Sequence, residues 1–250
     1  MGKSKIAIAA VCIILAAWSV QLIFAEEEQS GFDHSLYAQT LRISVVEGLV
    51  NYTGLKMNSL NLDRYLTLVG AMNPRALDIM TRNEKTAFYI NVYNARTLQV
   101  ILEHYPVSSI KEIPGVWNKI KFKIAGKQIT LDEIEHGILR AESKDPRIHF
   151  ALVCAAKGCP GLRNTPFTEK NFPAQLNDAG RKFLNDKTKN RLDKENNILY
   201  LSSIFKWFKE DFGNVKNFIE KYMSKNDIEF IEKNRPKIRY QYDWSLNELK

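Results

Sequence analysis

The sequence predicts a single α+β domain, in which helices pack on a small, mostly antiparallel sheet. Two observations support this fold class. Up to about His104, apolar residues recur at the spacing of one helix face, whereas short later stretches such as Lys119–Ile124 alternate apolar and charged residues with the period of a strand. Many helices combined with a few mostly antiparallel strands are typical of α+β domains. The hydrophobic content of 45% and the charged content of 26% indicate a globular protein.

Residues 1–25 are predicted to be a signal peptide or an N-terminal membrane anchor. Lys3 and Lys5 precede the apolar stretch Ile6–Phe24, and the small residue Ala25 follows it. This order is typical of a secretory signal. A membrane-spanning helix needs about 20 apolar residues, so the same stretch also suits an uncleaved anchor. We therefore expect an exported protein that is periplasmic, extracellular or anchored to a membrane.

Helices are predicted throughout the part that follows, which comprises an N-terminal helical part (residues 26–83) and the start of a second part (residues 84–247). Pro74 suits the first position of a helix, and Pro106 lies just beyond the end of the longest one. The predicted helices span residues 33–52, 61–68, from 73 onward, and 84–104.

Strands and helices are both expected from Lys119 onward. Lys119–Ile124 should be a strand that returns at Gln128–Ile129. Thr130 and Glu133 have the spacing of a capping box and predict a helix to about Arg140. We expect the central buried strand at residues 147–154. The remaining elements are predicted as helices at 171–186, 203–208, 215–223 and 227–232 and as strands at 198–201 and 238–242.

Charge and cysteine content narrow the possible functions. The chain carries 36 Lys and Arg against 28 Asp and Glu, a formal net charge of +8. The lysines are scattered rather than clustered within a binding motif, so no nucleic-acid partner is expected. Beyond the N-terminal segment only Cys154 and Cys159 remain. Two cysteines are too few for a disulfide framework, although an oxidising compartment allows one pair to form.

Six phrases of the sequence stand out together. They are, in order along the chain, Ala87–Ala95, Leu131–Arg140, Arg147–Ala155, Cys159–Pro160, Phe205–Phe212 and Tyr242–Asn247. With these phrases the chain resembles the DUF547 family, a family of domains of unknown function. The resemblance covers roughly residues 84–247 and implies a fold unit more firmly than an activity; it also implies export, because exported bacterial members are common in this family.

Cys159 is the first candidate for chemistry. It lies between Gly158 and Pro160 at the end of the expected central strand, where a turn would present its thiol. A thiol reacts as the thiolate, which requires a nearby base or cation. Two other interpretations remain open: Cys159 belongs to a packed turn, or it pairs with Cys154. In a regular strand Cys154 would lie on the apolar face, so we expect it in the core.

Two histidines are candidates for the base. His136 lies between Asp132 and Arg140 at intervals of four residues on a helix, although a solvated charged face has the same pattern. His149 lies on the expected central strand, where it is either a base or a buried, hydrogen-bonded residue. Asn91 and Glu135 are candidates to orient the histidine, as the third member of a thiol triad does. Asn91 and Asn94 alternatively tie their helix to neighbouring backbone.

These residues give three hypotheses. The first is a cysteine-dependent hydrolase or acyl transferase that acts on an amide, peptide or thioester of the cell envelope, with the amides of the Gly158–Cys159 loop as oxyanion hole. The second is a non-catalytic binding module. The third is a thiol–disulfide protein that uses Cys154 and Cys159. No cofactor and no metal are expected, and Trp207, Asp211 and Phe212 are interpreted as a structural clasp.

Overall fold

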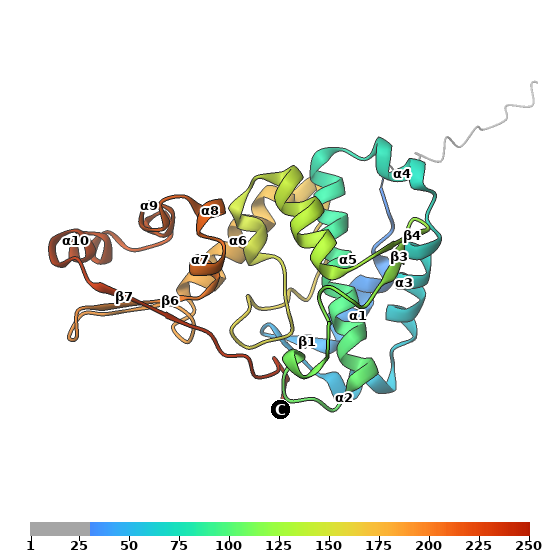
Figure 1. The fold of residues 1–250 in the computed structure, drawn as a ribbon, viewed down its shortest axis with the longest axis horizontal. Coiled ribbons are helices and arrows are strands. Elements are labelled where there is room, and N and C mark those ends of the chain that lie inside the picture. The colour runs from blue at the N-terminus through green and yellow to red at the C-terminus, as the bar shows by residue number, and fades with distance from the viewer. Residues whose placement is uncertain (1–30) are drawn as a thin grey trace, which may run out of the picture. The chain divides into compact units, whose positions relative to one another are not determined.

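Helix α5 (Arg82–His104) is the longest element of the computed structural model, which describes residues 31–250 (Figure 1). The expected signal peptide or anchor, residues 1–25, lies outside these described residues. None of the helices within residues 31–250 is long and apolar enough to cross a membrane.

The start of α5 is fixed by a capping box. The side chain of Thr81 accepts from the backbone N–H of Glu84, and the carboxylate of Glu84 accepts in return from the N–H of Thr81. Most of the helix is buried, because it packs against α3 (Leu60–Ala71) and against the helix η2 (Glu133–Ser143). The predicted helix at residues 84–104 is thereby confirmed.

The first predicted helix is shorter than expected. Helix α1 (Ser35–Ser44) is followed by a small hairpin of β1 (Val45–Val46) and β2 (Leu49–Val50). The turn between these strands needs positive φ angles at Glu47 and Gly48, 49° and 85°, and two β-branched residues that favour strands precede it. The prediction of continuous helix over residues 33–52 is therefore wrong beyond Ser44.

Two short helices complete the N-terminal part. Helix α2 (Tyr52–Met57) follows the hairpin directly and is capped by the side chain of Asn51. Helix α4 (Pro74–Ile79) begins at its proline, as predicted, with Asn73 as the capping residue.

A hairpin and a capped helix lead toward the site. Strands β3 (Phe122–Ile124) and β4 (Lys127–Ile129) pair antiparallel, as predicted. The backbone N–H of Thr130 then donates to Glu133 at 2.8 Å, and the N–H of Glu133 donates to the Thr130 hydroxyl at 3.2 Å. This confirms the capping box, and the helix η2 that follows is wound as a π-helix.

The predicted central strand at residues 147–154 is wrong. Residues Pro146–Phe150 form a 3-10 turn, η3, with the proline at its first position and the Asp145 carboxylate accepting from the N–H of Arg147. Residues 152–154 then have no regular secondary structure and pair with none of the described strands. Asn94 supplies the missing partner, because its amide donates to the carbonyl of Ala151 and accepts from the N–H of Val153, each at 2.9 Å. A buried run of apolar residues has the same pattern in either conformation.

The C-terminal part combines a three-stranded sheet with helices. Strand β6 (Ile198–Ser202) pairs antiparallel with β5 (Arg191–Asp193) and parallel with β7 (Lys237–Gln241). Its helices pack around a core that includes Phe150, Phe183 and Phe205. The other bounds are η1 (Ile110–Glu112), η4 (Glu169–Asn171), α6 (Phe172–Asn185), α7 (Ile204–Trp207), α8 (Lys209–Phe212), α9 (Val215–Glu220) and α10 (Lys225–Asn234).

The described residues confirm the predicted α+β class. Asp33–Lys250 form one unit in which helices predominate over three small sheets. Three of the four strand pairs in this unit are antiparallel and the pair β6–β7 is parallel.

Candidate functional site

Most of the predicted site residues line one pocket, which we call the disulfide pocket. It encloses about 370 Å³, within the range of roughly 300–1,000 Å³ that is common for small-molecule sites. Four of its lining residues were expected to carry chemistry: Glu135, His136, His149 and Cys159. The rest of its wall is largely aromatic, with Tyr93, Trp117, Trp207, Phe208, Tyr242 and Trp244 among the residues.

The two cysteines are joined in a disulfide. The Cα atoms of Cys154 and Cys159 lie 6.2 Å apart, within the range that a disulfide allows. Cys159 is 3% exposed, whereas Cys154 is only half-buried. The expectation that Cys154 belongs to the core is therefore wrong, because the absence of a regular strand lets its side chain turn toward the pocket. In this state Cys159 has no free thiol, so the nucleophile hypothesis requires the reduced protein.

The C-terminal segment holds the cysteine loop in place. The N–H of Gly158 donates to the carbonyl of Asp243 at 2.7 Å, and the N–H of Lys157 donates to Ser245 at 2.8 Å. The approach is so close that a Cβ atom on Gly158 would lie 2.8 Å from the backbone nitrogen of Asp243. A glycine at this position is therefore required by the contact with the C-terminal segment.

These contacts exclude the expected oxyanion hole. The amide of Gly158 is used by Asp243, and the N–H of Cys159 donates to the carbonyl of Ala156 at 3.0 Å. Neither amide is available to a substrate oxygen, so the prediction that this loop stabilises an oxyanion is wrong for this conformation.

Both sulfur atoms are hydrogen-bonded by neighbouring groups. The phenol oxygen of Tyr242 lies 3.0 Å from each sulfur. Burial keeps the pKa of Tyr242 well above its ordinary value, so the phenol retains its proton and donates it. The backbone N–H of Cys154 donates to the sulfur of Cys159 at 2.9 Å. These donors stabilise negative charge on sulfur when the disulfide opens.

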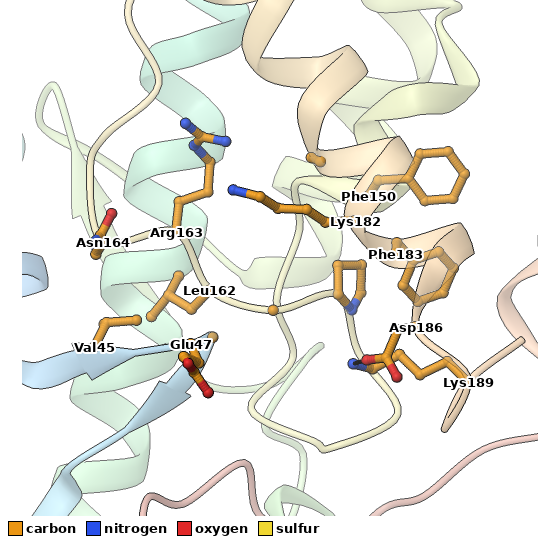
Figure 2. Close-up of a pocket in the computed structure, with 14 residues that line it drawn as sticks. Val45, Glu47, Phe150, Leu162, Arg163, Asn164, Lys182, Phe183, Asp186 and Lys189 are labelled. Atoms are coloured by element: carbon orange, nitrogen blue, oxygen red, sulfur yellow. Dashed lines mark hydrogen bonds and ion pairs between the residues drawn. The ribbon is translucent and has the colours of Figure 1, made fainter. Parts of the chain in front are cut away.

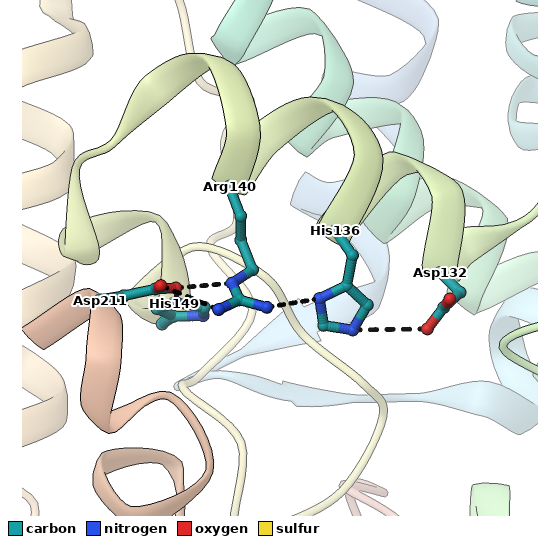
Figure 3. A network of polar contacts seen from close by, with 5 residues as sticks. All are labelled: Asp132, His136, Arg140, His149 and Asp211. Carbon is teal, nitrogen blue, oxygen red and sulfur yellow. Dashed lines mark hydrogen bonds and ion pairs between the residues drawn. The ribbon is translucent and has the colours of Figure 1, made fainter.

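The two histidines belong to one polar network, which Figure 3 shows. Arg140 donates to both carboxylate oxygens of Asp211, from Nε at 2.6 Å and from Nη2 at 2.8 Å. The same carboxylate lies 2.7 Å from Nε2 of His149. The Arg140 hydrogen bonds lower the pKa of Asp211 to about 2, so Asp211 is an acceptor and the Nε2 of His149 carries the proton.

His149 is a buried, hydrogen-bonded histidine. Its side chain is 1% exposed, and its ring stacks on Phe208 with 3.9 Å between the centroids. Burial lowers the pKa of His149 to about 4. The imidazole is therefore neutral at pH 7, and Asp211 is the group that orients it. Asp211 thus contacts a predicted site residue, rather than serving only as a structural clasp.

His136 has both ring nitrogens engaged. Nη1 of Arg140 donates to Nδ1 of His136 at 2.9 Å, so the ring proton lies on Nε2, which faces the carboxylate of Asp132 at 3.4 Å. The predicted succession of Asp132, His136 and Arg140 along one helix face is confirmed. In this arrangement Nδ1 has no lone pair left to accept a proton from a thiol.

The side chains of Glu135 and Asn91, the two candidates to orient a histidine, have different environments. The carboxylate of Glu135 accepts from the hydroxyl of Tyr93 at 3.1 Å, and burial raises the pKa of Glu135. Asn91 instead binds the backbone of Phe167, accepting from its N–H at 2.9 Å and donating to its carbonyl at 2.8 Å. Because both polar atoms of Asn91 are used in this way, the interpretation that it ties its helix to neighbouring backbone describes its contacts, and the orienting role has no support from them.

The aromatic wall was missed as part of the site. Trp207 ends helix α7, whereas Tyr242 and Trp244 follow β7, so residues far apart in the sequence meet here. The rings of Tyr242 and Trp244 are 4.6 Å apart, and those of Trp207 and Tyr242 are 4.7 Å apart. Two of the six DUF547-like phrases contain these residues, which was the available signal in the sequence.

A second hollow lies beside the loop that follows the disulfide. It encloses about 460 Å³ and is lined by residues that include Glu47, Leu162 and Arg163 (Figure 2). Its cations have carboxylate partners, since Arg163 contacts Asp178 at 2.6 Å and Lys189 contacts Asp186. None of the predicted site residues lines this hollow, so we do not assign it to the site.

Metal binding finds no support within residues 31–250. In this part of the chain no group of three or more His, Cys, Asp or Glu side chains is arranged to hold a metal ion.

The fold and site define an α+β domain with an aromatic pocket whose wall carries a disulfide and two hydrogen-bonded histidines. Residues 77–184 match the family model described as "Protein of unknown function, DUF547". The match includes the phrases at residues 87–95, 131–140, 147–155 and 159–160 and ends before the last two. Neither the curated proteins nor the solved structures include a match to the chain.

Proposed function

We propose that the protein is a thiol–disulfide oxidoreductase that uses Cys154 and Cys159. The observation that carries this proposal is the position of the disulfide, since both of its cysteines line the disulfide pocket. Cys154 is the more exposed partner and Cys159 the buried one. An accessible sulfur for attack and a protected one to resolve the intermediate suit exchange chemistry.

A structural role explains the disulfide less well. It joins residues only five apart in sequence, and closing so short a loop in the unfolded chain contributes only about 2 kcal/mol in the entropic model. A domain of this size also buries a sufficient core without staples. Stabilisation of the fold is therefore a weak reason for a disulfide at this place.

The proposed exchange balances as follows. A substrate thiolate attacks the sulfur of Cys154, which forms a mixed disulfide and releases Cys159 as a thiolate. A second substrate thiolate attacks the substrate sulfur of the mixed disulfide, so that the substrate leaves as a disulfide and Cys154 leaves as a thiolate. Two protons from the substrate thiols end on the two cysteines. A disulfide compound of the surroundings, such as oxidised glutathione, restores the oxidised protein by the reverse steps.

The hydrogen bonds around the sulfurs favour the first step. The leaving thiolate of Cys159 receives the N–H of Cys154 and the hydroxyl of Tyr242. Hydrogen bonds to an ionised group are stronger than those to a neutral one, and a stabilised thiolate leaves faster. The expected export of the chain would bring this disulfide into an oxidising compartment.

The experiment is reduction of the folded, full-length protein in glutathione buffers of defined potential, followed by alkylation with a maleimide that adds mass. A Cys12→Ser background removes the third cysteine. We expect the disulfide to open without unfolding, and Cys159→Ser to accumulate a mixed disulfide on Cys154. Reduction that occurs only after denaturation in urea would overturn the proposal.

A second candidate is the cysteine-dependent hydrolase or acyl transferase, acting in the reduced state. It is favoured by one observation, that His149 and Glu135 line the same pocket as Cys159. The reduced protein would be tested on chromogenic thioesters and amides. A hydrolase needs Cys159 alone, so Cys154→Ser should retain turnover and Cys159→Ser should lose it, whereas an oxidoreductase needs both cysteines.

A further inference from the structure

The aromatic wall of the disulfide pocket is built from three separate segments. Trp117 comes from the loop before β3, Trp207 from the end of α7, and Trp244 from the segment after β7. All three tryptophans of residues 31–250 line this one pocket. The ring of Trp244 is 5.6 Å from that of Trp207 and 6.1 Å from that of Trp117. Several aromatic rings therefore meet around one space, and organic ammonium ions bind against the faces of such rings.

The charge of the pocket has the sign that matches such a ligand. Asp132 and Glu135 line it, and none of its described lining residues is Lys or Arg, although the chain as a whole carries a net charge of +8. Arg140, the cation of the adjoining network, is paired with both oxygens of Asp211. The pocket is thus an acidic site in a basic protein.

The histidines do not supply an opposing charge. His149 is neutral at pH 7, because burial lowers its pKa to about 4. His136 accepts from Arg140 through Nδ1, which requires its neutral form in this arrangement. Asp132 therefore faces an uncharged ring.

Cations already lie over aromatic rings at the edge of this wall. The ammonium of Lys111 lies 5.1 Å from the ring centroid of Trp244, and the guanidinium of Arg140 lies 5.2 Å from that of Phe208. Neither cation belongs to the lining residues of the pocket.

We propose that the disulfide pocket binds a small organic cation, whose ammonium group lies against the tryptophan rings and is balanced by Asp132 and Glu135. The proposal names a ligand class for the site at which we propose thiol–disulfide exchange. It rests on that proposed function in one respect, namely that the thiol compound that exchanges with the disulfide would carry the cation. The pocket volume of about 370 Å³ is larger than an ammonium group needs. The ammonium group is therefore one part of the ligand, and the rest of the ligand fills the remaining space.

The test is calorimetric titration of the oxidised, full-length protein with choline. The matched control is 3,3-dimethylbutan-1-ol, which has the same shape without the charge, and sodium chloride controls for ionic strength. We expect choline to bind roughly tenfold more tightly than the neutral alcohol, the factor that cation–π contacts and a nearby carboxylate provide. Equal affinity for both compounds, or binding of neither, would overturn the proposal.

Variants identify the groups that bind the cation. Trp207 is 48% exposed, so Trp207→Leu threatens the fold least and should weaken choline binding by about threefold to tenfold. Glu135→Gln should also weaken choline binding, whereas Glu232→Gln, on the exposed side of α10, should not. Unchanged choline affinity in both pocket variants contradicts the proposal.

The experiments distinguish failure of the cation-site proposal from failure of the oxidoreductase proposal. The titration uses the oxidised protein and a ligand without a thiol, so it does not depend on exchange. Choline binding by a protein whose disulfide resists glutathione would leave the cation site standing and remove the oxidoreductase.

Discussion

The hydroxyl of Tyr242 lies 3.0 Å from the sulfur of Cys159 and equally far from that of its disulfide partner. Tyr242 reaches this position because the segment after β7 pairs with the cysteine loop through Gly158 and Lys157. The C-terminal segment, distant in sequence, thus supplies a proton donor to both sulfurs.

Tyr242→Phe should slow reduction of the disulfide by about tenfold. The substitution removes a hydrogen bond to the leaving thiolate, and hydrogen bonds to charged groups contribute about 1.5–3 kcal/mol. The rate of reduction by dithiothreitol, followed by alkylation of the released thiols, measures the effect. Tyr240→Phe on the exposed strand β7 is the matched control. Equal rates for the two variants would show that the phenol has no part in the exchange.

His149 should make stability depend on pH. Burial lowers the folded pKa of His149 to about 4, below its ordinary value of 6.5, so the unfolded chain binds the proton more readily. Its contribution to stability is present above pH 6.5 and is lost as the pH falls toward 4, by on the order of 3 kcal/mol in total. Urea unfolding of wild type and His149→Gln at pH 7 and pH 4 checks this. The variant should lose less stability between these pH values, and an identical loss would contradict the assignment.

Asp211→Asn should destabilise the protein by about 1–3 kcal/mol, because Arg140 and His149 lose a charged acceptor. Asp178→Asn is the matched variant, since Asp178 also receives an arginine but contacts no histidine among its described ion pairs. Thermal or urea unfolding at pH 7 should place Asp211→Asn below Asp178→Asn in stability. The reverse order would mean that the network around His149 contributes little.

The stability that Asp211 contributes should also depend on pH in the acid range. The Arg140 hydrogen bonds lower the pKa of Asp211 to about 2, below its ordinary value of 3.8. The stabilisation is therefore present above pH 3.8 and is lost as the pH falls toward 2. The difference between wild type and Asp211→Asn should shrink over this range.

Asn94→Ala and Asn91→Ala should each cost about 2–4 kcal/mol, because each leaves one buried N–H and one buried carbonyl without a partner. They should differ in their effect on the disulfide. Asn94 holds Ala151 and Val153, which lead directly into Cys154, whereas Asn91 holds Phe167 beyond the loop. Only Asn94→Ala should change the rate of reduction, and an equal change in both would contradict this.

Local signals in the sequence identified several elements correctly. Thr130 and Glu133 sit three residues apart, which is enough to fix a helix start, and Pro74 fixed another. The alternation in β3 and its return in β4 also needed only neighbouring residues. The buried run before Cys154 was assigned wrongly, because periodicity cannot distinguish a strand from another buried conformation when a distant side chain, Asn94, satisfies its backbone.

By itself, the sequence determined the α+β class and the capped helix that carries Glu135 and His136, and it indicated Cys159 as a candidate residue. Only the tertiary structure decided that Cys159 is bonded to Cys154, that Asp211 orients His149, and that an aromatic wall closes the pocket. The physical reason is the separation along the sequence between the residues that interact. Caps and alternation act between residues a few positions apart, whereas these three features join segments separated by tens of residues or depend on how a loop folds against the C-terminal segment.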